Sequence, residues 1–237
     1  QKKYRREALA FIVEGLKGVR EVLNLDLSVL LLLVEGSRRD EPQFVEIIAS
    51  AEGQQVPVEF LGRGDIGDIK CTDTFHGVLA VVEQPEVAPD MVLGGGPVIC
   101  LDRINDPGNL GTIIRTADWF GIKNIVLSEG SVDPYNHKVV RSTMGSISHV
   151  NIYEASNILE FLKRAQSDYT LVGLDLDARP IESLEPHKKA IYVFGSESHG
   201  LAEPLENLLD ERYTIEGKGE AESLNVAVSA GILMSRL

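Results

Sequence analysis

The chain has 237 residues, of which 43% are apolar and 25% charged, a composition that excludes a fibrous or disordered protein. Its 36 acidic residues outnumber the 23 lysines and arginines and give a formal net charge of -13, which argues against a uniformly basic nucleic-acid-binding surface. The longest apolar run, Val29 to Val34, is far shorter than the roughly 20 residues that a transmembrane helix needs.

The first part of the chain alternates strands and helices. Apolar runs predict four strands, at residues 8–15, 29–34, 56–61 and 77–82. Apolar residues spaced by three and four predict two helices, one on Leu16, Val19 and Leu23 and one on Phe44, Ile47, Ile48 and Ala51. Pro42 stands where the first turn of the second helix tolerates proline. We therefore expect a small α/β layer at the N-terminus.

A turn-prone stretch separates this layer from the rest of the chain. Residues 83–97 contain three prolines and three consecutive glycines, so they cannot hold regular structure for long. We expect a first domain over residues 1–88, a linker over 89–96 and a second domain over 97–237.

The second domain again alternates strands and helices. Strands are predicted at residues 98–101, 125–127, 170–174, 191–195 and 212–215. Helices are predicted at residues 156–166, from residue 223 to the end, and after the first strand, with a buried face of Leu110, Ile113, Ile114, Ala117 and Phe120. This order predicts a mostly parallel sheet covered on both faces.

Cysteines and histidines suggest no special chemistry. Cys71 and Cys100 are far apart, and we expect both to be buried small hydrophobes in a reducing compartment. The five histidines never occur at metal-ligand spacing, so no metal site is predicted. No targeting segment is visible at residues 1–6 or after them, and we expect a cytoplasmic protein.

Three polar segments of the second domain stand where predicted strands end. They are NDPGNLGTIIRTA from Asn105, VFGSESHGL from Val193 and ESLNVAVSAGILM from Glu222. Open parallel sheets bind ligands beyond the carboxyl ends of their strands, so these segments are the first candidates for a site.

Each segment also has a purely structural interpretation. In the first, Asn109 is a good helix N-cap and Arg115 could grip a phosphate, but the pattern also fits a capped helix with a solvated arginine. The second lacks the glycine spacing of nucleotide-binding loops and could be a simple turn. In the third, the polar side chains of Ser223 and Asn225 stand at the start of an apolar helix, and both need hydrogen-bond partners. A capping role for Ser223 accounts for only one of the two side chains.

In this order and at this spacing, the three segments resemble the signature motifs of the SpoU/TrmH branch of the SPOUT class of RNA methyltransferases. The resemblance covers Val98 to the end. The preceding part, with FIVEGLKGVREVL near its start, is similar to the ribosomal-protein-like substrate-binding domain of the family's 23S rRNA guanosine-2'-O-methyltransferases. The resemblance implies an α/β protein in which a small RNA-binding domain precedes a parallel-sheet domain with a deep trefoil knot.

The same resemblance implies the activity. Family members are dimers that transfer a methyl group from S-adenosylmethionine to a ribose 2'-hydroxyl of structured RNA, and the N-terminal domain favours ribosomal over transfer RNA. Carried over by motif, the catalytic residues are Asn109, Arg115, Glu197, Ser223 and Asn225. The cofactor would be held by Gly195, Ile215 and Leu224. RNA would be contacted by Arg115 and Arg141.

Arg115 has two possible roles at the reacting centre. The family's matching arginine has been proposed as the base that takes the hydroxyl proton, but a guanidinium stays protonated in ordinary protein settings. We therefore favour the hypothesis that Arg115 binds phosphate and stabilises the developing alkoxide.

Two other function classes compete with this hypothesis. One is a catalytically inactive RNA-binding or ribosome-assembly protein, against which the intact motif residues argue. The other is a dinucleotide-binding domain, whose glycine fingerprint is missing after the first strand. To reconcile an acidic chain with RNA, we expect a set of arginines to gather on one face: Arg5, Arg6, Arg38, Arg39, Arg103, Arg115 and Arg141.

Overall fold

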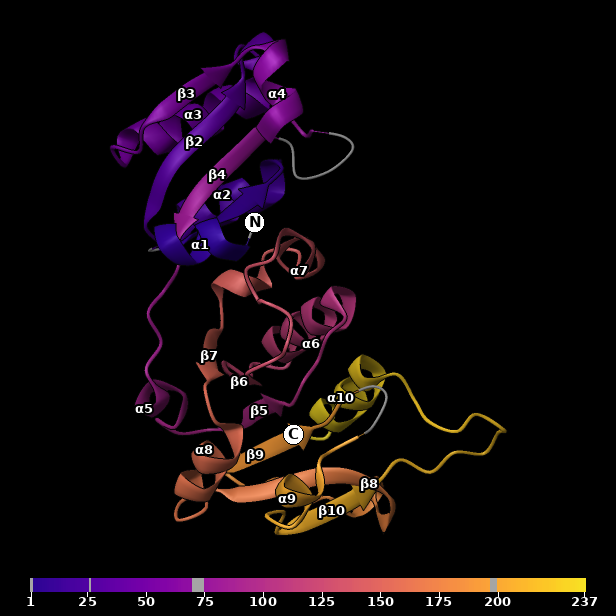
Figure 1. Cartoon of the computed structure of the whole chain (residues 1–237). Helices are drawn as coiled ribbons and strands as arrows, with labels where there is room; N and C mark the ends of the chain where they lie inside the picture. Colours follow the sequence, from indigo (N-terminus) through magenta and orange to yellow (C-terminus); the bar gives the residue numbers. More distant parts are fainter. Residues whose placement is uncertain (1, 26, 70–74, 197–199) are drawn as a thin grey trace. The chain divides into compact units, whose positions relative to one another are not determined.

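The computed structural model describes residues 2–25, 27–69, 75–196 and 200–237, so Cys71 and Glu197 lie outside the described residues. The chain divides into two compact units (Figure 1), one of residues 1–85 with 135–148 and one of residues 86–134 with 149–237. Residues 135–148, which the sequence analysis assigned to the second domain, therefore belong to the N-terminal unit. They are joined to it by the rings of Phe11 and Tyr135, whose centroids are 4.9 Å apart.

The N-terminal unit is built on a four-stranded sheet of order β1-β4-β2-β3. Its strands are β1 (Ala10–Glu14), β2 (Val29–Glu35), β3 (Val58–Leu61) and β4 (Val78–Glu83). Its helices are α1 (Lys2–Ala8), α2 (Leu16–Asn24), α3 (Pro42–Gly53), α4 (Arg63–Ile69) and α7 (His137–Ser142). β4 runs antiparallel to both β1 and β2, whereas β2 and β3 are parallel. The four predicted strands and two predicted helices are confirmed, and α1, α4 and α7 are additional.

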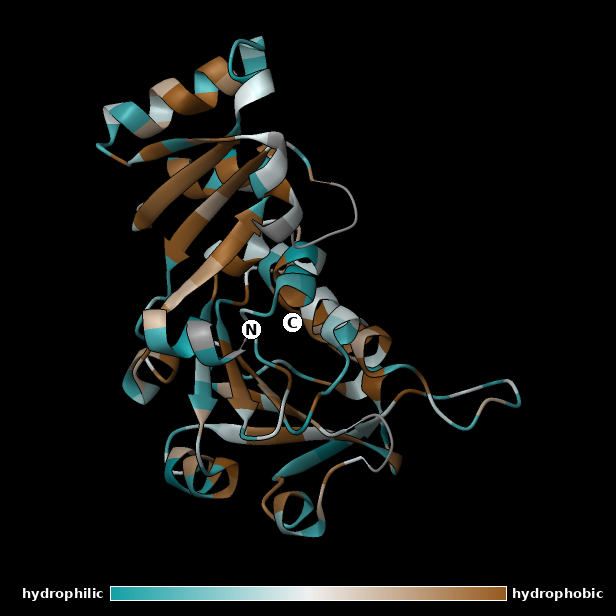
Figure 2. Ribbon diagram, turned by 45° about the horizontal axis from the view of Figure 1, so that its top comes forward, coloured by the Kyte–Doolittle hydropathy of each residue, from teal (hydrophilic) through white to brown (hydrophobic). Residues whose placement is uncertain are grey.

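The core of this unit follows from the apolar alternation of its strands, which are mostly brown in Figure 2. Fully buried residues of α2 and α3 include Val19 and Phe44. On the sheet, Leu33, Leu61 and Leu79 form a separate cluster, against which partly buried Ile66 of α4 packs. The central strands therefore bury side chains on both faces.

The second unit is built on a six-stranded sheet of order β10-β8-β9-β5-β6-β7, in which every neighbouring pair is parallel. Its strands are β5 (Val98–Leu101), β6 (Asn124–Ser128), β7 (Asn151–Ala155), β8 (Thr170–Pro180), β9 (Ala190–Phe194) and β10 (Glu211–Thr214). Its helices are α5 (Pro89–Val92), α6 (Pro107–Trp119), α8 (Ile158–Ala165), α9 (Glu203–Glu206) and α10 (Val226–Met234). The predicted parallel sheet is confirmed, and β7 is a strand that the sequence analysis missed.

Helices cover both faces of this sheet. Figure 1 shows α6 and α10 on one side and α8 and α9 on the other. Val98 and Cys100 pack with residues of α8, and all four residues of β5 are fully buried. None of the described helices is long and apolar enough to span a bilayer.

Two sequence-based details of the helices are wrong. Phe120 was predicted on the buried face of the helix after β5, but α6 ends at Trp119 and the Phe120 side chain is 43% exposed. The last helix begins at Val226 rather than Ser223, so Leu224 lies in the loop before it.

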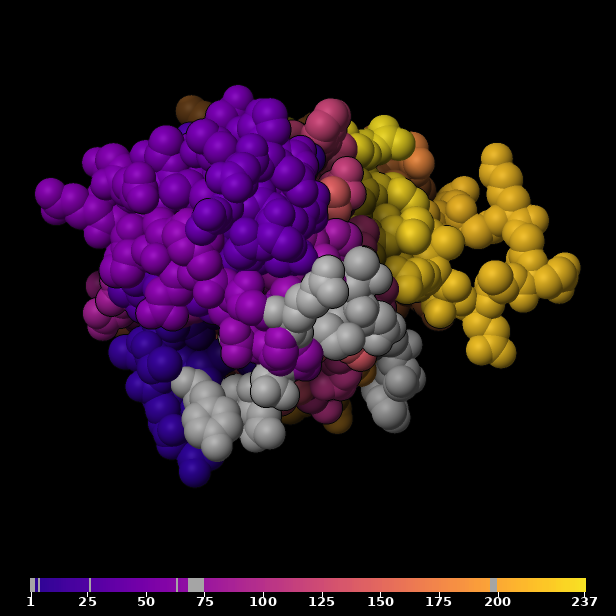
Figure 3. Space-filling view, turned by 90° about the horizontal axis from the view of Figure 1, so that it is seen from above, coloured from indigo at the N-terminus to yellow at the C-terminus, as the bar shows by residue number. Residues whose placement is uncertain are grey.

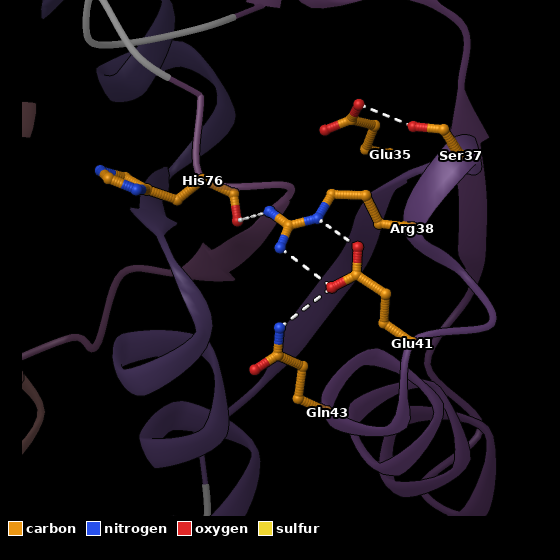
Figure 4. A network of polar contacts seen from close by, with 6 residues as sticks. All are labelled: Glu35, Ser37, Arg38, Glu41, Gln43 and His76. Carbon is orange, nitrogen blue, oxygen red and sulfur yellow. Dashed lines mark hydrogen bonds and ion pairs between the residues drawn. The ribbon is translucent and has the colours of Figure 1, made fainter.

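A clamped arginine stabilises the N-terminal unit (Figure 4). The Arg38 guanidinium donates from Nε and Nη2 to the two carboxylate oxygens of Glu41, at 2.9 and 3.0 Å. It also lies 4.5 Å from the ring centroid of Phe44. The hydrogen bonds with Glu41 raise the pKa of Arg38 and lower the pKa of Glu41. The arginine is thus fixed between a carboxylate and an aromatic ring.

Gly77 is the residue that leaves room for this clamp. Its φ is +85°, and a Cβ there would lie 2.8 Å from both Nη1 of Arg38 and Cζ of Phe44. We expect Gly77→Ala to lower the free energy of unfolding by about 1–3 kcal/mol, because it adds strain in the left-handed region to a steric conflict. Chemical denaturation followed by circular dichroism measures the change.

Gly53→Ala is the matched control for this prediction. Gly53 is the last residue of α3, and no described atom lies within 4 Å of its Cβ position. The control should leave stability unchanged or raise it by up to about 1 kcal/mol, since alanine favours helix. Equal effects of the two substitutions would contradict the steric argument.

Candidate active site

A cavity of about 810 Å³ lies against the middle of β8 and the carboxyl ends of β9 and β10. It is formed by two loops, one that follows β9 at Gly195 and one that joins β10 to α10 and contains both Ile215 and Leu224. The three predicted cofactor residues therefore line one cavity, together with Ser223 of the predicted catalytic set. The size suits a ligand as large as a nucleoside derivative.

The main chain packs tightly on itself just after β9, where Gly195, Ser196 and Gly200 line the cavity. Ser196 and Gly200 exchange two backbone hydrogen bonds of 3.0 Å and close a short loop. A Cβ at Gly195 would run directly into the backbone of Gly200 and Leu201. Only glycine fits at residue 195 without moving the loop, because the backbone of Gly200 and Leu201 packs directly against it.

The segment before α10, yellow in Figures 1 and 3, forms another wall of the cavity. It extends away from the sheet between β10 and α10. Exposed residues of this segment line the cavity, among them Glu216, Lys218, Glu222 and Leu224.

The first and third motif segments meet through two asparagines. Nδ2 of Asn225 donates to Oδ1 of Asn109 at 3.0 Å, although 116 residues separate them in the chain. A Cβ on Gly231 would lie 3.8 Å from the Thr116 side chain, so α10 lies alongside α6 in parallel. The Asn109–Asn225 bond thus ties the start of α6 to the start of α10, beside the cavity.

The caps of these helices differ from the predicted ones. α6 is capped by Asp106, whose Oδ1 accepts from the Asn109 backbone at 2.8 Å, so Asn109 lies inside the first turn rather than at the cap. α10 is capped by Asn225, which accepts from the Ala227 backbone at 2.9 Å, and not by Ser223. Asp followed by Pro is a typical start of a helix, and this signal could have identified Asp106.

Asn225 combines two structural roles, which gives a test. Asn225→Ala removes both the cap of α10 and the bond to Asn109, and we expect it to lower the unfolding free energy by about 1–3 kcal/mol. Asn225→Asp keeps the cap acceptor but loses the donor to Asn109, so it should cost less. Urea denaturation of the three proteins measures this. Equal stability of Asn225→Ala and the parent chain would contradict the assigned cap.

The two arginines predicted to contact RNA lie in different units. Arg115 is exposed on α6, and within residues 2–25, 27–69, 75–196 and 200–237 its guanidinium makes no hydrogen bond or ion pair. It lies six residues beyond Asn109, about 9 Å along the helix axis. Arg141 belongs to α7 in the N-terminal unit and lines a different cavity.

Several of the arginines expected to form one basic face are held by carboxylates. Arg38 is bound to Glu41, Arg39 to Asp40 at 3.6 Å, and Arg103 to Asp102 at 3.1 Å. Three of the seven arginines are thus paired with neighbouring carboxylates, and for these three the predicted separation of arginines from acidic residues is wrong. Arg115 and Arg141 keep their place as candidates.

The charge of the cavity at β8–β10 favours a cationic ligand. Its described lining contains three carboxylates, of Asp175, Glu216 and Glu222, and one ammonium group, of Lys218. Asp175 is also bound to Arg212 at 3.2 Å. S-adenosylmethionine carries one more positive than negative charge, whereas a dinucleotide carries a diphosphate that these carboxylates would repel. The chemistry of the lining therefore fits the sulfonium cofactor and disfavours the dinucleotide hypothesis.

Within the described part of the chain, neither the free cysteine of this unit nor a metal site adds to the chemistry of the cavity. Burial raises the pKa of the Cys100 thiol, so it is protonated and unreactive at neutral pH. Among the described residues, no group of three or more histidines, cysteines, aspartates and glutamates could hold a metal ion. Leu174, Asp175, Leu201 and Ser229 also line the cavity but were not singled out from the sequence. Leu174 and Asp175 stand outside the three motif segments, whereas Leu201 and Ser229 lie within the second and third of them.

Comparison with known proteins agrees with this geometry. A model of the SpoU rRNA Methylase family matches residues 96–235. The 23S rRNA (guanosine(2553)-2'-O)-methyltransferase RlmP of Bacillus subtilis is 30% identical over 100% of this chain and 91% of its own length. An AdoMet-bound rRNA methyltransferase structure from Sinorhizobium meliloti is 31% identical, with a TM-score of 0.86, over 100% of this chain and 89% of that one.

A more distant structure shows the same fold. The SpoU methyltransferase AviRb from Streptomyces viridochromogenes, solved with AdoMet, is 23% identical with a TM-score of 0.89, over 100% of this chain and 92% of that one. The chain belongs to the SpoU rRNA methylase family. The predicted SPOUT fold, with its C-terminal trefoil knot, and the predicted class of enzyme, an S-adenosylmethionine-dependent RNA methyltransferase, are confirmed.

Proposed function

We propose that the chain transfers the methyl group of S-adenosylmethionine to a ribose 2'-hydroxyl of ribosomal RNA. The observation that carries this proposal is the single cavity lined by Gly195, Ile215, Ser223 and Leu224, with the Asn109–Asn225 bond beside it. Two of the three motif segments, the loop after β9 and the segment before α10, line this cavity, and the first motif segment is tied to the third through Asn109.

The cofactor is held by main chain and apolar contact. Gly195 offers a backbone that a ligand can approach closely, and Ile215 and Leu224 supply apolar walls for the adenine. Leu224 is 48% exposed, and contact with the adenine would cover it. The carboxylates of Asp175, Glu216 and Glu222 complement the positive end of the molecule.

The chemistry is an in-line displacement. When bound, S-adenosylmethionine supplies a methyl group on a positively charged sulfur that leaves without help. The protein must align the ribose oxygen with that methyl group and manage the hydroxyl proton. Arg115 binds the RNA phosphate and stabilises the oxygen as negative charge develops on it, while the proton passes to solvent or a neighbouring group.

The remaining motif residues position this reaction. Asn109 and Asn225 hold α6, which carries Arg115, in register with α10 at the mouth of the cavity. Ser223 lines the cavity two residues before that junction. With Glu197, which lies outside the described residues, these groups would surround the reacting end of the cofactor.

The N-terminal unit contributes RNA binding. Ribosomal RNA is favoured over transfer RNA because this unit resembles a ribosomal-protein-like domain, and because the Bacillus subtilis relative bears the name of a 23S rRNA methyltransferase. Residues 1–88 then serve as the substrate-binding domain and residues 97–237 as the methyltransferase domain, with the reaction in the cytoplasm.

A homodimer completes the proposal. Trp119 at the end of α6 is 84% exposed, and Val228 of α10 is 49% exposed. α6 and α10 lie side by side, so this pair of helices carries exposed apolar side chains on both of its members. Burying it against a second copy would remove apolar area from water. Sedimentation as a monomer at micromolar concentration would contradict the dimer.

Methyl transfer from radiolabelled S-adenosylmethionine to ribosomal RNA tests the activity. Label in RNA at alkali-resistant dinucleotides is expected, because 2'-O-methylation blocks cleavage at the modified ribose. A folded protein that binds the cofactor by calorimetry but labels no RNA would support the inactive RNA-binding alternative. A folded protein that does not bind the cofactor or its demethylated product would refute the proposal altogether.

A further inference from the structure

A second cavity, of about 510 Å³, lies entirely within the N-terminal unit. One side is formed by β1 and the turn that leads into α2, and the other by α7 and the residues after it. It shares no residue with the cavity at β8–β10. The proposed methyl transfer therefore leaves this cavity without a function.

The lining of this cavity combines apolar side chains with basic ones. Ile12, Val13, Val140 and Ile147 contribute apolar side chains. Three cationic side chains line it, those of Lys17, Arg38 and Arg141, together with the imidazoles of His76 and His137. Of the described lining residues one, Glu14, is acidic. The carboxylates of Glu41, on Arg38, and of Glu21, against Gly145, lie next to the lining, so a ligand would meet mainly the positive charges of Lys17 and Arg141.

Neighbouring residues restrain the basic side chains of this cavity to different degrees. Arg38 is fixed by Glu41 and donates from Nη1 to the His76 backbone oxygen at 3.4 Å, as Figure 4 shows. Lys17 and Arg141 are exposed and can adapt to a ligand. Burial, with Lys138 and Arg5 nearby, lowers the pKa of His137, so its imidazole is neutral at pH 7 and can both donate and accept hydrogen bonds.

The turn from β1 into α2 adds main-chain groups. Gly15, with φ of +94°, stands at the N-cap and offers no side chain to the first turn of the nine-residue helix. Gly15, Leu16 and Lys17 all line the cavity. The hydroxyl oxygen of Ser148, another lining residue, is buried and has no hydrogen-bond partner among the described atoms. A bound polar group would satisfy it.

We propose that this cavity binds one unstacked nucleotide of the substrate RNA, with the base against the apolar wall and its phosphates on Lys17 and Arg141. Unpaired bases in loops and bulges are the usual targets of sequence-specific RNA recognition, and arginines bind their phosphates. The inference rests on the proposed function. It adds a second contact between the protein and the same RNA, because an unpaired nucleotide is recognised at a cavity other than the methyl-transfer cavity.

Binding of hairpin RNAs tests the proposal without requiring activity. The probes are an RNA hairpin with a single bulged nucleotide and the same hairpin fully paired, followed by fluorescence anisotropy. We expect the parent chain to bind the bulged hairpin more tightly. Lys17→Ala combined with Arg141→Ala should weaken binding about 10- to 100-fold, because charge-assisted hydrogen bonds are lost. The salt dependence of binding should also become less steep.

Two further variants separate charge from shape. Leu16→Trp fills the cavity and keeps every charge, so it should abolish the preference for the bulge while affinity for the paired hairpin remains. Arg39→Ala is the control, because Arg39 is an exposed arginine next to Arg38 that does not line the cavity. It should change affinity less than about twofold.

Failure of this inference can be distinguished from failure of the proposed function. Equal binding of the two hairpins by the parent chain, or an unchanged bulge preference in Leu16→Trp, would overturn the nucleotide site. Methyl transfer to ribosomal RNA is measured on the same proteins. If transfer proceeds with an unchanged KM for RNA in the charge variant, the cavity inference fails and the proposed function stands.

Discussion

Replacing Arg115 by alanine is expected to lower kcat for methyl transfer by about 10²–10³-fold, the usual loss when a donor to a developing negative charge is removed. The affinity for S-adenosylmethionine should be unchanged, because Arg115 does not line the cavity at β8–β10. Arg115 is exposed, so the fold should also be unaffected. Single-turnover kinetics and calorimetry measure the two quantities.

Arg115→Lys distinguishes charge from geometry. A lysine keeps the positive charge but cannot bind a phosphate with two parallel hydrogen bonds, so we expect a loss of about 10-fold or more. Near-normal turnover of Arg115→Lys would refute both hypotheses for this residue, the phosphate clamp and the general base.

Arg164→Ala serves as the control for this pair of variants. Arg164 is an exposed arginine of α8, on the opposite face of the sheet from α6, and is bound to Asp90 at 2.7 Å. Its removal should leave kcat and cofactor affinity unchanged. A comparable loss in this variant would show that net charge, rather than the position of Arg115, determines the rate.

The sequence predicted those parts of the fold in which burial alone dictates the pattern. β5 and β9 are buried on both faces, so their apolar runs were easy to identify. β7 lies at the edge of the sheet and is only partly buried, and its sequence NIYEA gives a weak signal. The assignment of residues 135–148 to the N-terminal unit depends on packing such as Phe11 against Tyr135, which no local pattern encodes.

The candidate site was predicted from motif order rather than from physical pattern. Apolar spacing placed Asn109 and Asn225 near helix starts, but their mutual hydrogen bond joins residues 116 positions apart and depends on the three-dimensional arrangement. Asp175 was missed for a similar reason, since it lies within β8 and reaches the cavity only through the sheet order.

Replacing Gly195 by alanine is expected to weaken binding of S-adenosylmethionine by at least about 100-fold. The added Cβ would run into the backbone of Gly200 and Leu201, and backbone cannot give way as a flexible side chain can. Relief requires the loop after β9 to move, and this loop is a wall of the cofactor cavity. Calorimetric titration with S-adenosylmethionine and with its demethylated product measures the loss.

Gly217→Ala is the matched control, since Gly217 lines the same cavity but no described atom lies within 4 Å of its Cβ position. It makes the same chemical change in the same cavity without a steric conflict, and cofactor affinity should stay within about threefold of the parent value. If Gly195→Ala bound the cofactor as tightly as Gly217→Ala, the close approach at Gly195 would not determine the cofactor site. If both variants lost binding while remaining folded, the flexibility of the glycines, and not the space at residue 195, would be the property that the cofactor requires.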